Sequence, residues 1–142
     1  MRVIELKPGD EALLQRAEDL FYPGAAALQR AAALLREPTF VMVAALDEDG
    51  DVMGRIYGHI LHRFEATDFL LYEVDVAEAH QRKGVGRAMV EHLKRLAIAR
   101  GWREMWVLTE LDNEAGNALY RSAGGSLEGS PANMYVFPVV ER

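Results

Sequence analysis

A strand, a basic glycine loop and a long amphipathic helix follow one another between residues 69 and 100. This succession restricts the fold more than any other feature of the chain. Residues 69–76 read as a strand, and a seven-residue loop leads from Val76 into Gly84-Val85-Gly86. Apolar side chains then recur at helical spacing as far as Arg100. A strand followed by a helix with one apolar stripe requires a layered fold of sheet and helices.

The remaining residues supply further strands and helices on both sides of this unit. Asp10 is expected to cap a helix that stops before Pro23, and a second helix carries Leu28 to Leu35 before Pro38. A further helix is expected over 113–123, and the pattern allows a short strand near Ser126-Leu127. Strands are predicted over 3–6, 39–46, 52–61, 69–76, 105–109 and 135–140. The predicted order is β-α-α-β-β-β-α-β-α-β, an α/β (α+β) fold with a mixed central β-sheet flanked by about four helices.

Length and composition suggest a single domain over residues 1–142. The chain has no cysteine, which excludes disulfides and thiolate chemistry and fits a reducing cytoplasm. No apolar run approaches the roughly 20 residues that span a bilayer, and Met1–Glu5 lacks a signal-peptide pattern. A cytoplasmic protein that binds no membrane is therefore expected.

The net charge of −6 disfavours nucleic acid as a partner, because nucleic-acid binding needs a basic surface. The same charge suits a cationic small molecule, although moderate acidity also serves solubility alone. No metal site is expected: His59 and His62 lie three apart on a predicted strand and so point to opposite faces.

The loop into the helix at Gly84 has the properties of a phosphate site. Free N–H groups at a helix start lie beside the positive end of the helix dipole, and glycines let an anion approach closely. Arg82, Lys83 and Arg87 add positive charge. The pattern lacks both the third glycine of a dinucleotide fingerprint and the Gly-Lys-Ser/Thr of a P-loop. A short site for a pyrophosphate remains, against the alternative of a plain strand-to-helix turn.

Two motifs resemble the GNAT N-acetyltransferase superfamily. The segment Gln81-Arg82-Lys83-Gly84-Val85-Gly86-Arg87-Ala88 is similar to that family's acetyl-CoA pyrophosphate loop. Farther along, Asn113, the pair Leu119-Tyr120 and Gly124 resemble a second block of the family. The order of elements is also similar from end to end. The chain is thus identified as a member of the superfamily, with acetyl-CoA as its expected co-substrate.

The resemblance implies a role for each cofactor-binding residue. The strand over 69–76 would splay from the next strand, so that backbone groups of Val74 and Val76 hold the pantetheine arm. Asn113 would bond the same arm. The pyrophosphate would lie on the loop formed by Gln81, Arg82, Lys83, Gly84, Val85, Gly86 and Arg87.

The resemblance also implies that Tyr120 protonates the departing thiolate as a general acid, where the alternative is a core tyrosine on a helix face. Glu73 and Asp75 alternate with Val74 and Val76, so both carboxylates are predicted on one face of the strand. They could bind a cationic amine and accept its proton, with Glu73 preferred as the base. The alternative places both on a solvent-exposed face.

Within the superfamily, the chain is most similar to the small aminoglycoside 3-N-acetyltransferases, through segments such as Leu34-Leu35-Arg36, Thr39-Phe40 and Phe64-Glu65. The resemblance implies 3-N-acetylation of an aminoglycoside antibiotic, a resistance activity. It also implies contacts to the substrate amine by Glu73 and Glu110, and Asp112 lies in the same acidic loop. Acetylation of another small amine, a polyamine or a protein amine, and a non-catalytic acetyl-CoA-binding module, are the alternatives. A homodimer is expected from family habit.

Overall fold

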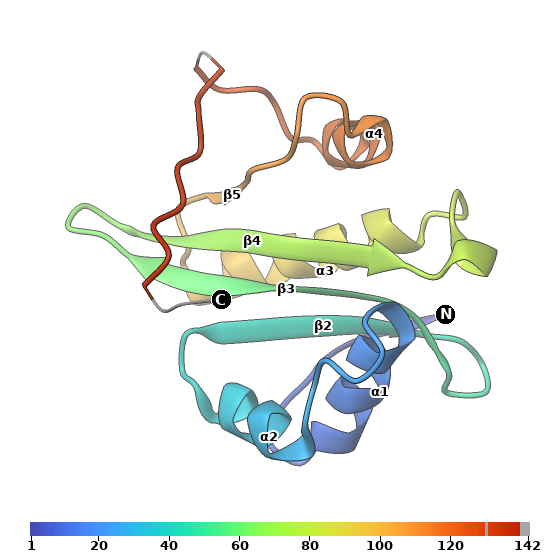
Figure 1. Cartoon of the computed structure of the whole chain (residues 1–142). Coiled ribbons are helices and arrows are strands. Elements are labelled where there is room, and N and C mark those ends of the chain that lie inside the picture. Colours follow the sequence, from blue (N-terminus) through green and yellow to red (C-terminus); the bar gives the residue numbers. More distant parts are fainter. Residues whose placement is uncertain (130, 140–142) are drawn as a thin grey trace.

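The computed structural model describes residues 1–129 and 131–139, and a five-stranded sheet forms its centre (Figure 1). Its strands lie in chain order, with β1 to β4 antiparallel and β5 parallel to β4. In sequence, the elements are β1 (Arg2–Glu5), α1 (Glu11–Phe21), α2 (Leu28–Arg36), β2 (Phe40–Leu46), β3 (Val52–His62), β4 (Thr67–Val76), the 3-10 helix η1 (Glu78–His80), α3 (Val85–Arg100), β5 (Met105–Val107) and α4 (Glu114–Ser122). The predicted mixed sheet with four flanking helices is confirmed.

The helices cover the sheet on both faces. Helices α1 and α2 pack on one face, and α3 packs on the other with α4 beside it (Figure 1). Strand β2 is buried from both sides: Val41, Val43 and Ala45 join the core under α3, while Met42 and Ala44 join the core under α1 and α2. A strand buried on both faces is an almost continuous apolar run, which accounts for the sequence VMVAAL.

One local expectation, at the start of α1, differs from the structure. Asp10 stands at the start of α1, but its side chain makes no capping bond to that helix. Its carboxylate instead accepts the Lys7 N–H at 2.9 Å, which closes the turn that precedes the helix. Asn113 does cap α4, since its Oδ1 accepts the Gly116 N–H at 3.0 Å.

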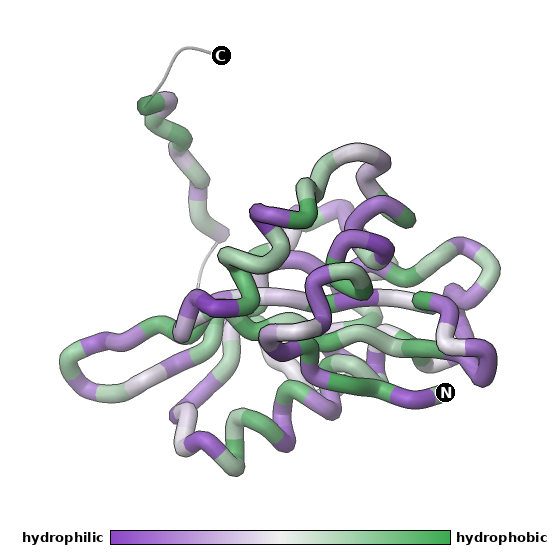
Figure 2. The backbone as a smooth tube through the Cα atoms, turned by 90° about the horizontal axis from the view of Figure 1, so that it is seen from below, coloured by the Kyte–Doolittle hydropathy of each residue, from purple (hydrophilic) through white to green (hydrophobic). Residues whose placement is uncertain are grey.

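The predicted closing strand is not formed. Residues 135–139 lie in no sheet, residue 140 lies outside the described residues, and no strand occurs near Ser126-Leu127. The segment runs away from the body of the protein (Figure 2), with Tyr135, Phe137 and Val139 from 79% to 93% exposed. An apolar run has strand character on its own, but it joins a sheet only where it meets a strand edge, and that meeting cannot be derived from the local pattern.

No helix in the described part of the chain has the length and apolar character that crossing a membrane requires.

Candidate active site

The loop between β4 and α3 follows a defined path beyond the end of β4. Gly84 has a φ of 82°, and Arg82 has a φ of 62°, the one positive φ among the described non-glycine residues. Glycine adopts this region without steric penalty, whereas an arginine there is unusual and such outliers cluster at functional sites. The Gln81 side chain fastens the loop to the strand, because its Nε2 donates a 3.0 Å hydrogen bond to the Val76 carbonyl.

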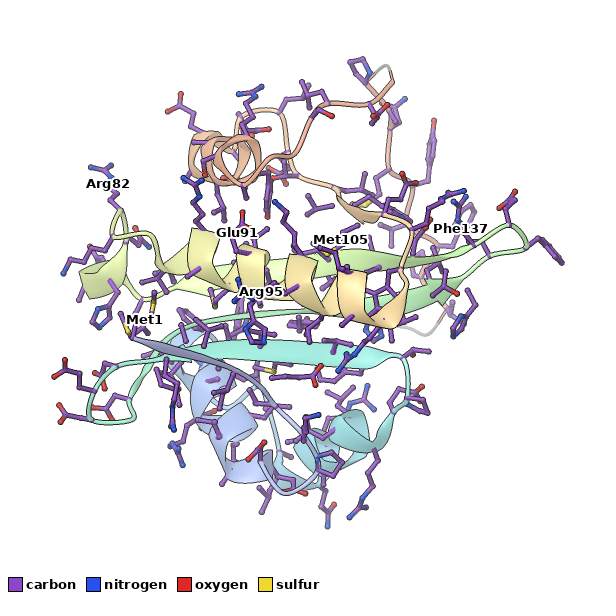
Figure 3. The ribbon with its side chains drawn as sticks, turned by 180° about the vertical axis from the view of Figure 1, so that it is seen from behind. Met1, Arg82, Glu91, Arg95, Met105 and Phe137 are labelled. Atoms are coloured by element: carbon purple, nitrogen blue, oxygen red, sulfur yellow. The ribbon has the colours of Figure 1, made fainter. Side chains whose placement is uncertain are left out.

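The first turn of α3 offers an anion site. Its first intrahelical hydrogen bond runs from the Ala88 N–H to the Gly84 carbonyl, so the amides of residues 85–87 precede it. Three exposed cations surround this helix end, and one of them, Arg82, projects outward in Figure 3. Arginine and lysine side chains, unpaired amides and the positive end of the helix dipole together fit a pyrophosphate. The three exposed cations at this helix end are Arg82, Lys83 and Arg87.

Gly86 brings helix α4 close to this turn. A Cβ at position 86 would lie 3.1 Å from the side chain of Leu119, a tighter contact than nearly all real Cβ atoms make. The missing side chain at Gly86 therefore sets how near α4 lies to the loop. Tyr120 follows Leu119 in α4, so its position depends on the same close packing.

The second half of β4 has a neighbour on one side alone. Strand β5 pairs with β4 from Phe69 to Leu71, whereas β4 continues to Val76. Over residues 73–76, the described strands pair with β4 only on its β3 side. The backbone groups of this open edge can bond an extended ligand in the manner of an added strand. The edge and the basic loop meet at the same end of β4.

A β-bulge sets which side chains of β4 face which core. Tyr57 pairs with Glu73 and Gly58 pairs with Leu71, so Tyr72 is one extra residue in β4. Any side chain at Gly58 would overlap the Leu70 carbonyl and press on the Phe69 ring. Glycine is therefore required where the two strands come closest.

The bulge reverses the alternation of β4. Before it, Phe69 and Leu71 point into the core under α3, and after it Val74 and Val76 pack against that same core. If β4 paired regularly through Tyr72, without the bulge, positions 73 and 75 would enter this core instead. Glu73 and Asp75 consequently lie on the opposite face, the side of α1, as the local alternation predicts.

A buried arginine lies under the two carboxylates. Arg55 of β3 is 0% exposed, and its Nη1 lies 3.0 Å from Asp75 Oδ2 while its Nη2 lies 3.6 Å from Glu73 Oε2. Its Nε donates a 2.6 Å hydrogen bond to Glu18 Oε2 of α1. Burial opposes the charge of Arg55, but Glu18, Asp75 and Glu73 outweigh it and raise its pKa above the ordinary value. The guanidinium is therefore permanently charged.

Two tyrosines occupy the oxygens of Glu73. The Tyr22 hydroxyl donates to Oε1, and the Tyr57 hydroxyl donates to Oε2 at 3.2 Å. The hydrogen bond to Glu73, with a smaller effect of burial, raises the pKa of Tyr22 to about 12. Burial first, and then the charge of Glu73, raise the pKa of Tyr57. Both hydroxyls therefore stay protonated and remain donors at neutral pH.

Asp75 is less enclosed than Glu73, with 34% of its side chain exposed. Burial raises its pKa, the positive charge of Arg55 opposes the rise, and the charges of Glu73 and Glu18 add to it. Across the open edge of β4, burial and then the charge of Asp75 raise the pKa of Tyr120 above 10. The region thus holds a carboxylate with increased proton affinity and a phenol that stays neutral.

Two cavities flank these groups. One of about 390 Å³ lies on the side of α1 and α2, and its polar and aromatic lining includes Glu18, Phe40, Tyr57, His59 and Tyr72. The other, of about 330 Å³, lies between α3, α4 and β5, and Tyr120 and Lys94 line it. Glu18 and Tyr120 therefore line separate cavities, while Glu73 and Asp75 line neither.

The other predicted site residues lie in the loop before α4. The Asn113 Nδ2 donates to Thr109 Oγ1 at 2.8 Å, and its Oδ1 caps α4, so both ends of this amide have a protein partner. Glu110 and Asp112 are exposed in the same loop. Among the described residues, no hydrogen bond or ion pair joins either carboxylate to the Glu73 cluster.

Sequence reasoning missed Arg55, Glu18, Tyr22 and Tyr57. The available signal was a single arginine, Arg55, within a predicted strand whose neighbours Gly54 and Ile56 are buried types. A charged residue at such a position needs a partner, and Asp75 stands directly opposite it in the β3–β4 register.

Known proteins resemble this chain in sequence and in fold. N-alpha-acetyltransferase 40 of Saccharomyces cerevisiae is 37% identical over 87 residues, which cover 56% of this chain and 30% of that protein. The chain spans about a third of the length of the curated relatives it matches. A crystal structure of an aminoglycoside acetyltransferase from an uncultured soil metagenomic sample has a TM-score of 0.82 at 29% identity, covering 96% of this chain and 98% of that one.

A more distant similarity extends over the whole fold. An aminoglycoside antibiotic 6′-N-acetyltransferase from Acinetobacter baumannii has a TM-score of 0.76 at 14% identity and covers 99% of both chains, which supports the fold alone. The model of the acetyltransferase (GNAT) family matches residues 10–124. This match includes the strand with the open edge, the basic loop and both helices that follow, and the chain therefore belongs to the acetyltransferase (GNAT) family.

Proposed function

We propose that this chain transfers the acetyl group of acetyl-CoA to a primary amine of a small cationic acceptor. One observation carries the proposal: three features meet at the C-terminal end of β4. They are the open backbone edge near Val76, the basic loop that enters α3, and the carboxylates of Glu73 and Asp75. An extended thioester ligand with a pyrophosphate and a cationic amine would each find a complementary surface there.

The cofactor residues follow from this placement. The pantetheine arm would pair with the edge at Val74 and Val76, and an amide near Val76 would polarise the thioester carbonyl. Asn113 would contact the arm through the second lone pair of its capping oxygen. The pyrophosphate would lie on Gln81, Arg82, Lys83, Gly84, Val85, Gly86 and Arg87.

The amine nitrogen loses two protons in the proposed reaction. Asp75 accepts the first from the acceptor ammonium, and the freed amine nitrogen forms a bond to the acetyl carbonyl carbon. The carbon–sulfur bond then breaks, and the Tyr120 hydroxyl donates its proton to the departing thiolate. The second proton leaves the nitrogen as the amide forms and restores the Tyr120 hydroxyl through solvent. Burial makes Asp75 a stronger proton acceptor by raising its pKa, and the raised pKa of Tyr120 keeps its proton available.

Glu73 is proposed to bind the ammonium beside Asp75. The sequence favours Glu73 as the base, yet hydroxyls of Tyr22 and Tyr57 already donate to its two oxygens. Both oxygens of Glu73 thus already have hydroxyl partners, and the carboxylate is suited to attract a cation. Asp75 keeps an exposed side toward the acceptor.

An aminoglycoside, acetylated at its 3-amine, is the proposed acceptor. Support comes from the soil aminoglycoside acetyltransferase at 29% identity and from Glu18 and the aromatic side chains that line the same cavity. Carboxylates and aromatic rings are the groups that bind amino sugars. Glu110 and Asp112 would add an acidic rim for the outer amines.

A protein α-amine is a second candidate acceptor. The 37% identity to N-alpha-acetyltransferase 40 supports it. The two candidates differ in the acceptor alone, so both predict the same cofactor residues.

The test follows thiol release from acetyl-CoA with gentamicin, kanamycin, spermidine and a short peptide with a free N-terminus as separate acceptors. Release that requires an aminoglycoside, with the new acetyl group located on the 3-amine by NMR, is the expected result. Release with the peptide alone would select the α-amine. Tight acetyl-CoA binding without release for every acceptor would contradict the proposal.

A further inference from the structure

Arg55 is more enclosed by opposite charge than a structural ion pair requires. Three carboxylates, from Glu18, Asp75 and Glu73, lie 2.6, 3.0 and 3.6 Å from its guanidinium. The contact to Glu18 joins α1 to the sheet, and one such pair would suffice for that purpose. The other two carboxylates therefore need another explanation.

The charges of this cluster do not balance. Three carboxylates and one guanidinium leave an excess of two negative charges when all are ionised, since three minus one is two. Arg55 is 0% exposed, whereas Glu73 and Asp75 keep 28% and 34% of their side chains exposed. The excess negative charge thus lies on the outer side of the cluster, where a second cation can reach it.

On the inner side of the acidic cluster, the Arg55 guanidinium occupies a site that is built to hold a cation. The rings of Phe21, Tyr22 and Tyr57 lie 5.3, 5.6 and 5.3 Å from the central guanidinium carbon. Aromatic faces at this distance bind cations. Within the described residues, Nη1 and Nη2 of Arg55 make no well-directed hydrogen bond, so Asp75 and Glu73 are held by charge more than by fixed geometry.

We propose that Arg55 is a positioning and specificity-determining residue of the acceptor site. It fills the inner end of the acidic cluster as a built-in cation and leaves the outer end, at Glu73 and Asp75, for one acceptor ammonium. The inference rests on the proposed acetyl transfer and names its substrate class: amines that direct one ammonium toward Glu73 and Asp75 and hold any further ammonium on the outer side, away from Arg55. A second ammonium directed inward would meet the charge of Arg55.

The proposal includes the ionisation of Asp75, whose surroundings come from four elements. Glu18 and Tyr22 approach from α1 and its C-terminal end, Arg55 and Tyr57 from β3, Glu73 from β4 and Tyr120 from α4. Among these groups Arg55 is the cation. Replacement of its charge should therefore move the titration of Asp75 to higher pH.

Three variants separate the effect of the shape of the Arg55 side chain from the effect of its charge. Arg55→Lys keeps the charge but loses the planar fork that reaches three carboxylates. Arg55→Met removes the charge and keeps an unbranched side chain, and Arg55→Met with Glu18→Gln reduces the number of unpaired carboxylates if the single variant does not fold. The matched control is Arg63→Lys, because Arg63 also lies beside β3 and pairs with a buried carboxylate, Asp68, at 2.8 Å, outside the cluster.

The experiment measures kcat and KM by thiol release, with propylamine and 1,3-diaminopropane as a matched pair of acceptors. Arg55→Lys should raise KM for both amines about tenfold with a smaller change in kcat, while Arg63→Lys stays near wild type. Removal of the charge should raise the preference for the diamine about tenfold. Folded Arg55 variants with wild-type KM and unchanged preference would overturn the inference.

A second measurement does not depend on turnover. Carboxyl NMR titration of Asp75 in the full chain should show its midpoint at higher pH in Arg55→Met or the double variant, and 1,3-diaminopropane should shift its resonance more than propylamine does. The same midpoint and equal responses to both amines would overturn the inference. If the wild type acetylates no amine while these shifts occur, the proposed reaction fails and the role of Arg55 in cation binding stands.

Discussion

The Tyr57 hydroxyl donates a 3.2 Å hydrogen bond to the Glu73 carboxylate directly across the β3–β4 pair. Tyr57 also lines the cavity on the side of α1 and α2, so one ring joins the acidic cluster to that cavity. Tyr57 is therefore a common neighbour of Glu73 and of the cavity.

Removal of the Tyr57 hydroxyl should therefore affect both stability and acceptor binding. Tyr57→Phe is expected to lower the free energy of unfolding by about 1–2 kcal/mol, because a partly buried bond to a charged group is lost. KM for the acceptor should rise while KM for acetyl-CoA stays unchanged. Urea unfolding and steady-state kinetics check the two effects. Tyr22→Phe is the matched variant, since it frees the other oxygen of Glu73 from a more exposed position.

Tyr120→Phe should lower kcat by about 10²- to 10⁴-fold, the usual contribution of a general acid. The phenyl ring keeps the packing of α4, so acetyl-CoA affinity by calorimetry should stay within about twofold of wild type. Full turnover in this variant would show that another group protonates the thiolate.

Gly86→Glu should abolish acetyl-CoA binding. It places a negative charge at the helix end that is proposed to hold the pyrophosphate, and its Cβ presses on Leu119. Gly86→Ala is the control, because it introduces the Cβ contact without the charge. Isothermal titration of both variants with acetyl-CoA separates the causes: equal losses in the two would assign the effect to displacement of α4.

The pH dependence of kcat/KM should report Asp75. Its pKa is raised above 3.8 by burial, and the proposed base must be ionised, so activity should increase as pH rises through that shifted value. Tyr120 should not limit activity below pH 10, because its pKa is raised as well. Asp75→Asn should remove the acid limb together with most of the activity. An unchanged acid limb in that variant would assign it to another group.

Asp75 should also make stability depend on pH in a defined direction. A carboxyl group whose pKa is higher in the folded state than in the unfolded state binds more protons when folded. Its contribution to stability is complete below the unfolded pKa and is lost as pH rises through the folded pKa. Asp75→Asn should therefore melt no lower than wild type at pH 8, and a large decrease in Tm would contradict this sign.

Local patterns were sufficient for most of the fold and part of the site. The periodicity of α3, the strand alternation at Glu73 and Asp75 and the glycine loop are properties of short segments. Arg55 and Glu18 are 37 residues apart and meet only because α1 packs on β3. Such pairs depend on tertiary packing, which explains why sequence reasoning missed the arginine under the carboxylates.

The bulge at Tyr72 decides which face of β4 carries the two acids. Regular pairing of β4 with β3 through Tyr72, with no bulge, would turn both acids into the apolar interior, while two valines would take their place on the acceptor side. The sequence would be the same, yet the acceptor side would lose both acids and the core under α3 would lose both valines. Relatives that keep a residue between Leu71 and Glu73 are therefore expected to keep the glycine at Gly58 as well, where the two strands come closest. A relative with an alignment gap at Tyr72 would need no bulge to hold its acids on this face.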